Sequence, residues 1–175
     1  MLIRNATELY AEAIGNLHAA SWRDAYRGIL SDEYLDRKSY ADRLAFWRRR
    51  FREESGGKLF VRVAEEEGML LGFVCVVLDA DTRWGALLDN LHIRPDARGR
   101  GLGRRLMAEA AAWVHGQRPG SPMHLWVFEQ NRQAVGFYES LGGEMVERVL
   151  KPAVDGSNVV SLRYLWRDLS TLKLL

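Results

Sequence analysis

Three glycines at alternate positions, Gly99, Gly101 and Gly103, constrain the fold of this chain more than any other feature. They follow an apolar run at residues 87–93, which has the length of a β-strand and ends at Arg-Pro-Asp. After them, apolar residues recur at the three- and four-residue spacing of one helix face: Leu102, Leu106, Ala110 and Trp113. The sequence therefore predicts a strand, a glycine-rich turn and a helix that begins at the glycines.

A turn of this kind is suited to an anion. A helix start leaves about four backbone N–H groups without partners and carries about half a positive charge. Glycines let a ligand approach the backbone closely, and arginines add charges that can pair with phosphate oxygens. The segment expected to bind consists of Arg98, Gly99, Arg100, Gly101, Leu102, Gly103 and Arg104. The pattern predicts a pyrophosphate ligand.

The common nucleotide motifs do not fit this turn. A dinucleotide fingerprint needs Gly or Ala three residues after its second glycine, and the two available registers place Arg104 or Leu106 there. No Gly-x-x-x-x-Gly-Lys-Ser/Thr occurs, which excludes a P-loop. A bare Gly-x-Gly is also typical of an ordinary strand-to-helix connection. However, Arg-x-x-Gly-x-Gly after a strand ending in Ile-x-Pro resembles the acyl-CoA signature of the GNAT superfamily of N-acetyltransferases.

Length and composition favour a single soluble domain spanning residues 1–175. With 47% hydrophobic and 27% charged residues the chain has an ordinary globular composition, and its net charge of +2 does not favour nucleic acid as a partner. The longest apolar run, residues 69–78, is about half the roughly 20 residues that span a bilayer. Since the N-terminus shows no signal-peptide pattern either, we expect no membrane association and a cytoplasmic location.

Cys75 is the only cysteine of the chain. An intrachain disulfide and a cysteine-based metal site are therefore excluded, and no His-x-x-x-His pair suggests another metal site, so we expect none. Because Cys75 lies within an apolar run, it is expected to be a small buried residue rather than a catalytic thiol.

Periodicity and turn residues predict the other elements of the chain. Residues 58–65 and 69–78 should form an antiparallel hairpin followed by a loop at residues 79–83. Further strands are expected at residues 2–5, 124–128, 144–151 and 158–167, and further helices between Thr7 and Gly28, between Ser31 and a break at Ser55-Gly56-Gly57, and at residues 131–140. The predicted order is a strand, two helices, three strands, a helix, a strand, a helix and two strands.

This order and two further motifs extend the resemblance to the whole chain. Asn131, followed seven residues later by Tyr138 in Phe-Tyr-Glu-Ser-Leu-Gly, is similar to the second motif of the family. Ser-Trp-x-x-Ala-Tyr-x-Gly-Ile-Leu and the terminal Tyr-x-Trp-x-Asp-Leu look like a bacterial subgroup that acetylates small amines. The resemblance implies the GNAT fold, an α/β (α+β) domain with a mixed, mostly antiparallel sheet of about seven strands and four helices. It also implies acetyl-CoA-dependent transfer to a primary amine of a small molecule, by direct attack in a ternary complex.

The resemblance also implies roles for individual residues. Backbone groups of Leu91, His92 and Ile93 would bind the pantetheine arm of acetyl-CoA, and Asn131 would also contact this cosubstrate. Tyr138 is the expected acid, because a phenol with a pKa of about 10 can donate to a thiolate whose conjugate acid is near 8.5. A packed core aromatic is the alternative for Tyr138.

The sequence leaves several candidates for the general base. An alkylammonium has a pKa of about 10.4, so a group or a water must take its proton before attack. The position where family members often carry Glu holds Leu87 or Leu88, and Asp89 is the nearest carboxylate on that strand. His92, His124 and a water-mediated relay remain as alternatives.

The acceptor is not identified by the sequence. Trp22, Tyr26 and Trp166 could line its pocket and stack on a cation, or they could belong to the core. A protein N-terminus or lysine is the alternative acceptor, although Trp126 stands where some protein-acetylating relatives have a catalytic Glu. A non-catalytic acyl-CoA sensor is a further alternative. A homodimer also stays open, because many relatives form dimers.

Overall fold

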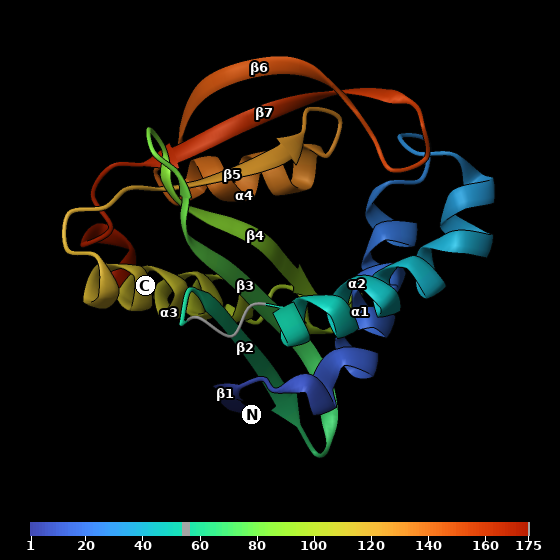
Figure 1. Ribbon diagram of the computed structural model, residues 1–175, viewed down its shortest axis with the longest axis horizontal. Helices are drawn as coiled ribbons and strands as arrows, with labels where there is room; N and C mark the ends of the chain where they lie inside the picture. The colour runs from blue at the N-terminus through green and yellow to red at the C-terminus, as the bar shows by residue number, and fades with distance from the viewer. Residues whose placement is uncertain (54–56, 175) are drawn as a thin grey trace.

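The computed structural model describes residues 1–53 and 57–174, and its elements follow the predicted order. The predicted break at Ser55-Gly56 lies outside the described residues. The strands are β1 (Leu2–Asn5), β2 (Leu59–Glu66), β3 (Met69–Asp81), β4 (Gly85–Ile93), β5 (Met123–Phe128), β6 (Glu144–Pro152) and β7 (Asn158–Trp166), and the helices are α1 (Ala11–Ala25), α2 (Ser39–Glu53), α3 (Leu102–Gln117) and α4 (Arg132–Ser140) (Figure 1).

The strands form one mixed sheet that divides into two arms. Its order is β1-β2-β3-β4-β5-β7-β6, and β4–β5 is the parallel pair among the neighbours. These two strands pair only at Ala86 with Met123 and at Leu87 with His124. In Figure 1 they diverge from there, so that β6 and β7 curve over β5 and α4 at the top while β1 to β4 descend below. This confirms the mixed, mostly antiparallel sheet that the sequence predicted.

Two hydrophobic cores cover opposite faces of the lower arm. Because side chains alternate along a strand, Val74 and Val76 of β3 pack toward α3, whereas Phe73 and Cys75 pack toward α1 and α2. Cys75 is fully buried, as predicted. The helix face predicted for α3 is confirmed too, since Leu102, Leu106 and Ala110 are buried.

The structure differs from the prediction at three boundaries. The loop expected at residues 79–83 was wrong in part, because β3 continues to Asp81, which pairs with Gly85 of β4. Thr7 makes no side-chain cap, and α1 begins at Ala11 after a short 3-10 turn. The second helix contains a π-helical stretch, Tyr34–Lys38, which the regular period of its apolar residues did not indicate.

Candidate active site

The divergence of β4 and β5 opens a cavity of about 460 Å³ between the two arms of the sheet. This is the volume of a small-molecule site, and it lies where the facing edges of two strands lack a neighbour. Side chains from α1, β4, the glycine turn, β5 and α4 meet there. The lining residues are Ser21, Ala25, Tyr26, residues 88–93, residues 97–99, residues 101–104, residues 125–127, Asn131, Gln133, Ala134, Phe137 and Tyr138.

The glycine turn presents unused backbone donors to this cavity. Gly99 and Gly101 both have φ +74°, and a Cβ at either would meet no heavy atom within 4 Å. Within residues 1–53 and 57–174, no hydrogen bond reaches the backbone N–H groups of residues 99–104, and the first helical bond is donated by Arg105 to the Gly101 carbonyl, at 3.1 Å. The turn therefore fits a diphosphate, as the sequence predicted, because its amides and the α3 N-terminus face open space.

The arginines of the turn are engaged with protein partners instead of being free for phosphate. Arg98 forms an ion pair of 2.7 Å with Asp24 of α1, and Arg100 forms one of 2.9 Å with Glu66 of β2. The Arg104 guanidinium donates to the Ser140 hydroxyl at 3.1 Å. In this state these side chains fix the turn against its neighbours, and the backbone amides are the available donors.

The strand and helix beside the turn place the other predicted cosubstrate residues. Leu91, His92 and Ile93 pair with β3 along one edge of β4, while their other edge faces the cavity. Asn131 lines the cavity as the N-cap of α4, where its side-chain oxygen accepts from the Ala134 N–H at 3.3 Å. All four residues are therefore within the walls of one cavity.

Tyr138 lies in the wall that α4 contributes and is 9% exposed. Burial raises the pKa of its phenol well above the ordinary value, and the nearby Tyr26 raises this pKa further. The hydroxyl therefore keeps its proton at any physiological pH, as a hydrogen-bond donor requires.

Asp89 occupies a β-bulge. Asn90 faces Cys75 of β3 and Leu88 faces Val76, which leaves Asp89 without a partner on that strand. Its carboxylate lines the cavity and accepts from the Asn90 amide at 2.9 Å, and it forms an ion pair of 3.0 Å with Arg50 of α2. The bulge thus brings a charged carboxylate to the cavity from a strand that is otherwise apolar.

The alternative bases differ in position. His92 lines the cavity, and its ring centre lies 4.5 Å from that of the buried His18. Burial, with smaller contributions from Arg98 and Arg43, lowers the pKa of His92 to about 3. His124 lies outside the cavity, with Nδ1 3.1 Å from the Trp84 carbonyl oxygen, which argues against it as a base.

These histidines predict a pH-dependent stability. Burial holds the pKa of His18, like that of His92, well below the unfolded value of about 6.5. Between pH 6.5 and about 3 the unfolded chain therefore binds protons that the folded chain does not, and stability falls as the pH falls, by up to about 1.4 kcal/mol per pH unit for each histidine. In urea unfolding at pH 7 and pH 5, His92→Asn should reduce this slope. An unchanged slope would contradict the buried neutral imidazole.

The three aromatic residues predicted for the acceptor have different positions. Tyr26 lines the cavity, but Trp22 does not, and the Arg43 guanidinium covers its ring at 4.3 Å. The prediction that Trp166 lines the acceptor pocket was wrong. This residue is 3% exposed and packs in the core, where its Nε1 donates to the Leu141 carbonyl at 3.0 Å. The reason is the alternation along β7, which turns Leu162, Tyr164 and Trp166 together toward that core.

The described residues contain neither a metal-binding cluster nor a membrane-spanning helix. No group of three or more His, Cys, Asp or Glu side chains is placed to hold a metal ion. No helix in the same part of the chain is long and apolar enough to cross a membrane.

Comparison with known families decides the identity of this arrangement. A model of the Acetyltransferase (GNAT) family matches residues 16–143, which include the cavity walls, the glycine turn and α4. The chain belongs to this family. It is therefore an acetyltransferase, as the sequence predicted.

Individual relatives agree with this GNAT assignment. The chain is 28% identical to the uncharacterized N-acetyltransferase YuaI of Bacillus subtilis over 169 residues, 93% of this chain and 90% of YuaI. The PaiA N-acetyltransferase of Thermoplasma acidophilum, solved in complex with coenzyme A, has a TM-score of 0.72 at 22% identity and covers 92% of this chain and 96% of its own. The structure of YncA from Salmonella typhimurium with acetyl-CoA has a TM-score of 0.66 at 21% identity and covers 95% of this chain and 93% of its own.

Some residues in the wall of this GNAT cavity were missed from the sequence. Ser21 and Ala25 lie four residues apart on α1, and Asn90 precedes His92 by two positions on β4. Strand alternation from His92 indicates Asn90, but helical spacing from Tyr26 leads to Trp22 and not to Ser21 or Ala25. No such signal marks the extra residue in the bulge at Asp89, because bulges depend on the pairing of two strands.

Proposed function

We propose that this GNAT protein transfers the acetyl group of acetyl-CoA to a primary amine of a small molecule, by direct attack in a ternary complex. One observation supports this most strongly. Residues 99 and 101–104, whose amides have no hydrogen bond within the described part of the chain, line the same cavity as Tyr138 and Asp89. A diphosphate site and two groups able to move a proton are thus combined in one space.

Acetyl-CoA is the cosubstrate, and the proposal assigns its contacts as follows. Backbone amides of residues 99–104 donate to the diphosphate, with the helix dipole of α3 adding to their attraction. The open edge of β4 at Leu91, His92 and Ile93 hydrogen-bonds the pantetheine amides, as an added strand would, and Asn131 contacts the same arm from α4. The thioester is thereby placed between β4 and Tyr138.

The chemistry then needs two protons to leave the acceptor nitrogen, one before attack and one as the amide forms, and one hydrogen bond to reach the sulfur. Asp89 takes a proton from the acceptor ammonium, directly or through a water, so that the neutral nitrogen can attack the thioester carbonyl. The carbon–sulfur bond breaks and its electron pair stays on the sulfur. Tyr138 donates a hydrogen bond to this thiolate, which finally takes the second proton of the attacking nitrogen, while Asp89 passes the first proton to water. The raised pKa of Tyr138 favours this hydrogen bond over complete transfer of its own proton.

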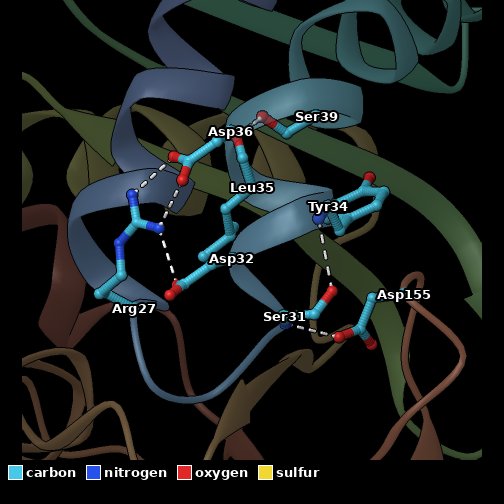
Figure 2. Close-up of polar contacts among 8 residues, drawn as sticks. All are labelled: Arg27, Ser31, Asp32, Tyr34, Leu35, Asp36, Ser39 and Asp155. Atoms are coloured by element: carbon cyan, nitrogen blue, oxygen red, sulfur yellow. Dashed lines mark hydrogen bonds and ion pairs between the residues drawn. The ribbon is translucent and has the colours of Figure 1, made fainter.

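A small acceptor is favoured because a hydrogen bond joins the connection between α1 and α2 to the turn between β6 and β7. Figure 2 shows the Ser31 N–H donating to Asp155 of the β6–β7 turn, at 2.7 Å. Hydrogen bonds from Ser157 lower the pKa of Asp155 to about 2, so this contact persists at physiological pH. Next to it, Arg27 binds both Asp32 and Asp36 (Figure 2), which holds the connection between α1 and α2 in shape.

An apolar cluster lies behind this contact. It joins Leu30 and Tyr34 to Val159 of β7, and the Tyr26 ring packs 4.9 Å from Phe128 of β5. The wall of the cavity at Tyr26 is therefore backed by packed residues. This supports a small molecule over an extended protein segment as the acceptor.

A panel of amines tests this function. The protein is incubated with acetyl-CoA and small amines or peptides, while free thiol and acetylated product are measured by absorbance and mass spectrometry. We expect thiol release coupled to acetylation of a small amine. Acetylation of peptides alone would favour the protein acceptor, and coenzyme binding without thiol release from any acceptor would favour the sensor.

The role of Asp89 predicts a large kinetic effect. Asp89→Asn should lower kcat/KM for the amine by about 100-fold near pH 7, because general bases contribute about 10²–10⁴-fold. The loss should shrink toward pH 10, where the amine is increasingly neutral without help.

Asp79→Asn is a matched control, because Asp79 also pairs with an arginine, Arg118 at 2.9 Å, but lies outside the cavity. Its positive φ of 52° is compatible with Asn. Circular dichroism shows whether both variants fold. Wild-type turnover in folded Asp89→Asn would assign the proton to His92 or to water.

A further inference from the structure

A second phenol shares the cavity with Tyr138, and the proposed function gives it no chemical role. Tyr26 follows the last turn of α1 and lines the same cavity as Tyr138 of α4. In the described residues neither Tyr26 nor Tyr138 has a hydrogen bond to its hydroxyl, whereas the Tyr34 and Tyr164 hydroxyls donate to Asp42 at 2.6 Å and to Glu139 at 2.8 Å. Tyr26 and Tyr138 thus line the cavity with hydroxyls that remain available to a ligand.

The surroundings of Tyr26 and Tyr138 keep both hydroxyls protonated, so both can donate a hydrogen bond. Burial raises the pKa of Tyr26 to about 12, and Tyr26 in turn raises the pKa of Tyr138, so the two hydroxyls lie within electrostatic reach of each other. Both residues line the same cavity and their hydroxyls have no protein partner among the described residues, so one ligand atom that accepts hydrogen bonds can be bound by both. During acetyl transfer negative charge develops first on the thioester carbonyl oxygen and then on the departing sulfur, which keeps the charge once the carbon–sulfur bond has broken.

We infer that Tyr26 is a second catalytic hydrogen-bond donor, which holds the coenzyme A thiolate together with Tyr138. This inference rests on the proposed function. No covalent bond or proton of Tyr26 is exchanged: the sulfur keeps the electron pair of the broken carbon–sulfur bond, and its proton comes from the acceptor amine. Tyr26 would therefore act on the leaving group. Its aromatic ring alone had suggested only a wall of the acceptor pocket.

The test measures the pKa of the thiol of bound coenzyme A and needs no acceptor. Binding of coenzyme A is first measured by calorimetry. The ultraviolet absorbance of the thiolate is then followed from pH 6 to pH 9.5 in wild type, Tyr26→Phe, Tyr138→Phe and Tyr34→Phe, with the ligand-free protein subtracted. Tyr34→Phe is the matched control, because its hydroxyl is bonded to Asp42 and it does not line the cavity.

Loss of either donor should make the bound thiol about tenfold harder to ionise, which raises its pKa by about one, while Tyr34→Phe should match wild type. Tyr26→Phe should also lower kcat about tenfold with the acceptor KM little changed. A thiol that titrates alike in wild type and Tyr26→Phe, or a variant that changes only KM, would overturn the inference and leave the proposed function intact. Failure of the wild type to bind coenzyme A would remove the proposed function and this inference together.

Discussion

Gly101→Trp is expected to weaken coenzyme A binding by about 100-fold or more while the protein still folds. An indole at this position would fill the space in front of the unbonded amides, since a Cβ there meets no heavy atom within 4 Å. Loss of two hydrogen bonds to a charged phosphate, each worth about 1.5–3 kcal/mol, gives an effect of this size. The positive φ of 74° adds a folding cost of about 1–2 kcal/mol, which a domain of ordinary stability tolerates.

Gly120→Trp separates the two effects. Gly120 has φ +80° and the same open surroundings, but it lies between α3 and β5, outside the cavity. Calorimetric titration with coenzyme A should show wild-type affinity for Gly120→Trp and a loss for Gly101→Trp, with similar melting temperatures. Equal affinity in both variants would place the diphosphate elsewhere.

Tyr138→Phe is expected to lower kcat by about 100-fold and to leave the affinity for coenzyme A within about twofold. Removal of one hydrogen bond to charge that develops in the transition state costs about 10²–10³-fold in rate. The ring itself stays, so the packing of Tyr138 against Phe137 and Trp166 should be preserved.

Tyr164→Phe is the control for this substitution. Tyr164 is buried too, but its hydroxyl donates to Glu139 and it does not line the cavity. Its replacement should affect stability by about 1 kcal/mol and leave kcat unchanged. If steady-state assays gave the same kcat for Tyr138→Phe and wild type, Tyr138 would be only a core residue.

The elements of this fold could be predicted because they depend on local patterns. The apolar period after Gly103 fixed the face of α3, and alternation together with turn residues fixed most strands. The short β4–β5 ladder was not predictable, because it depends on how two distant segments twist apart. The family resemblance implied a mixed sheet but not the place where it divides.

The candidate site was predictable only where the motif is continuous in sequence. Gly99 and Gly101 have the left-handed backbone that the motif requires. In contrast, the partners of Arg98 and Arg100 are 74 and 34 positions away, and no pattern in the sequence identifies them. Trp166 was misassigned because alternation along a strand does not say which face is the core.

The central claim is that the amides of residues 99–104 bind the diphosphate of acetyl-CoA, and a crystal structure with coenzyme A tests it most directly. The account predicts phosphate oxygens within about 3.2 Å of several of these backbone nitrogens, with the sulfur between β4 and Tyr138. A diphosphate bound away from these nitrogens, or a sulfur outside the cavity, would contradict it.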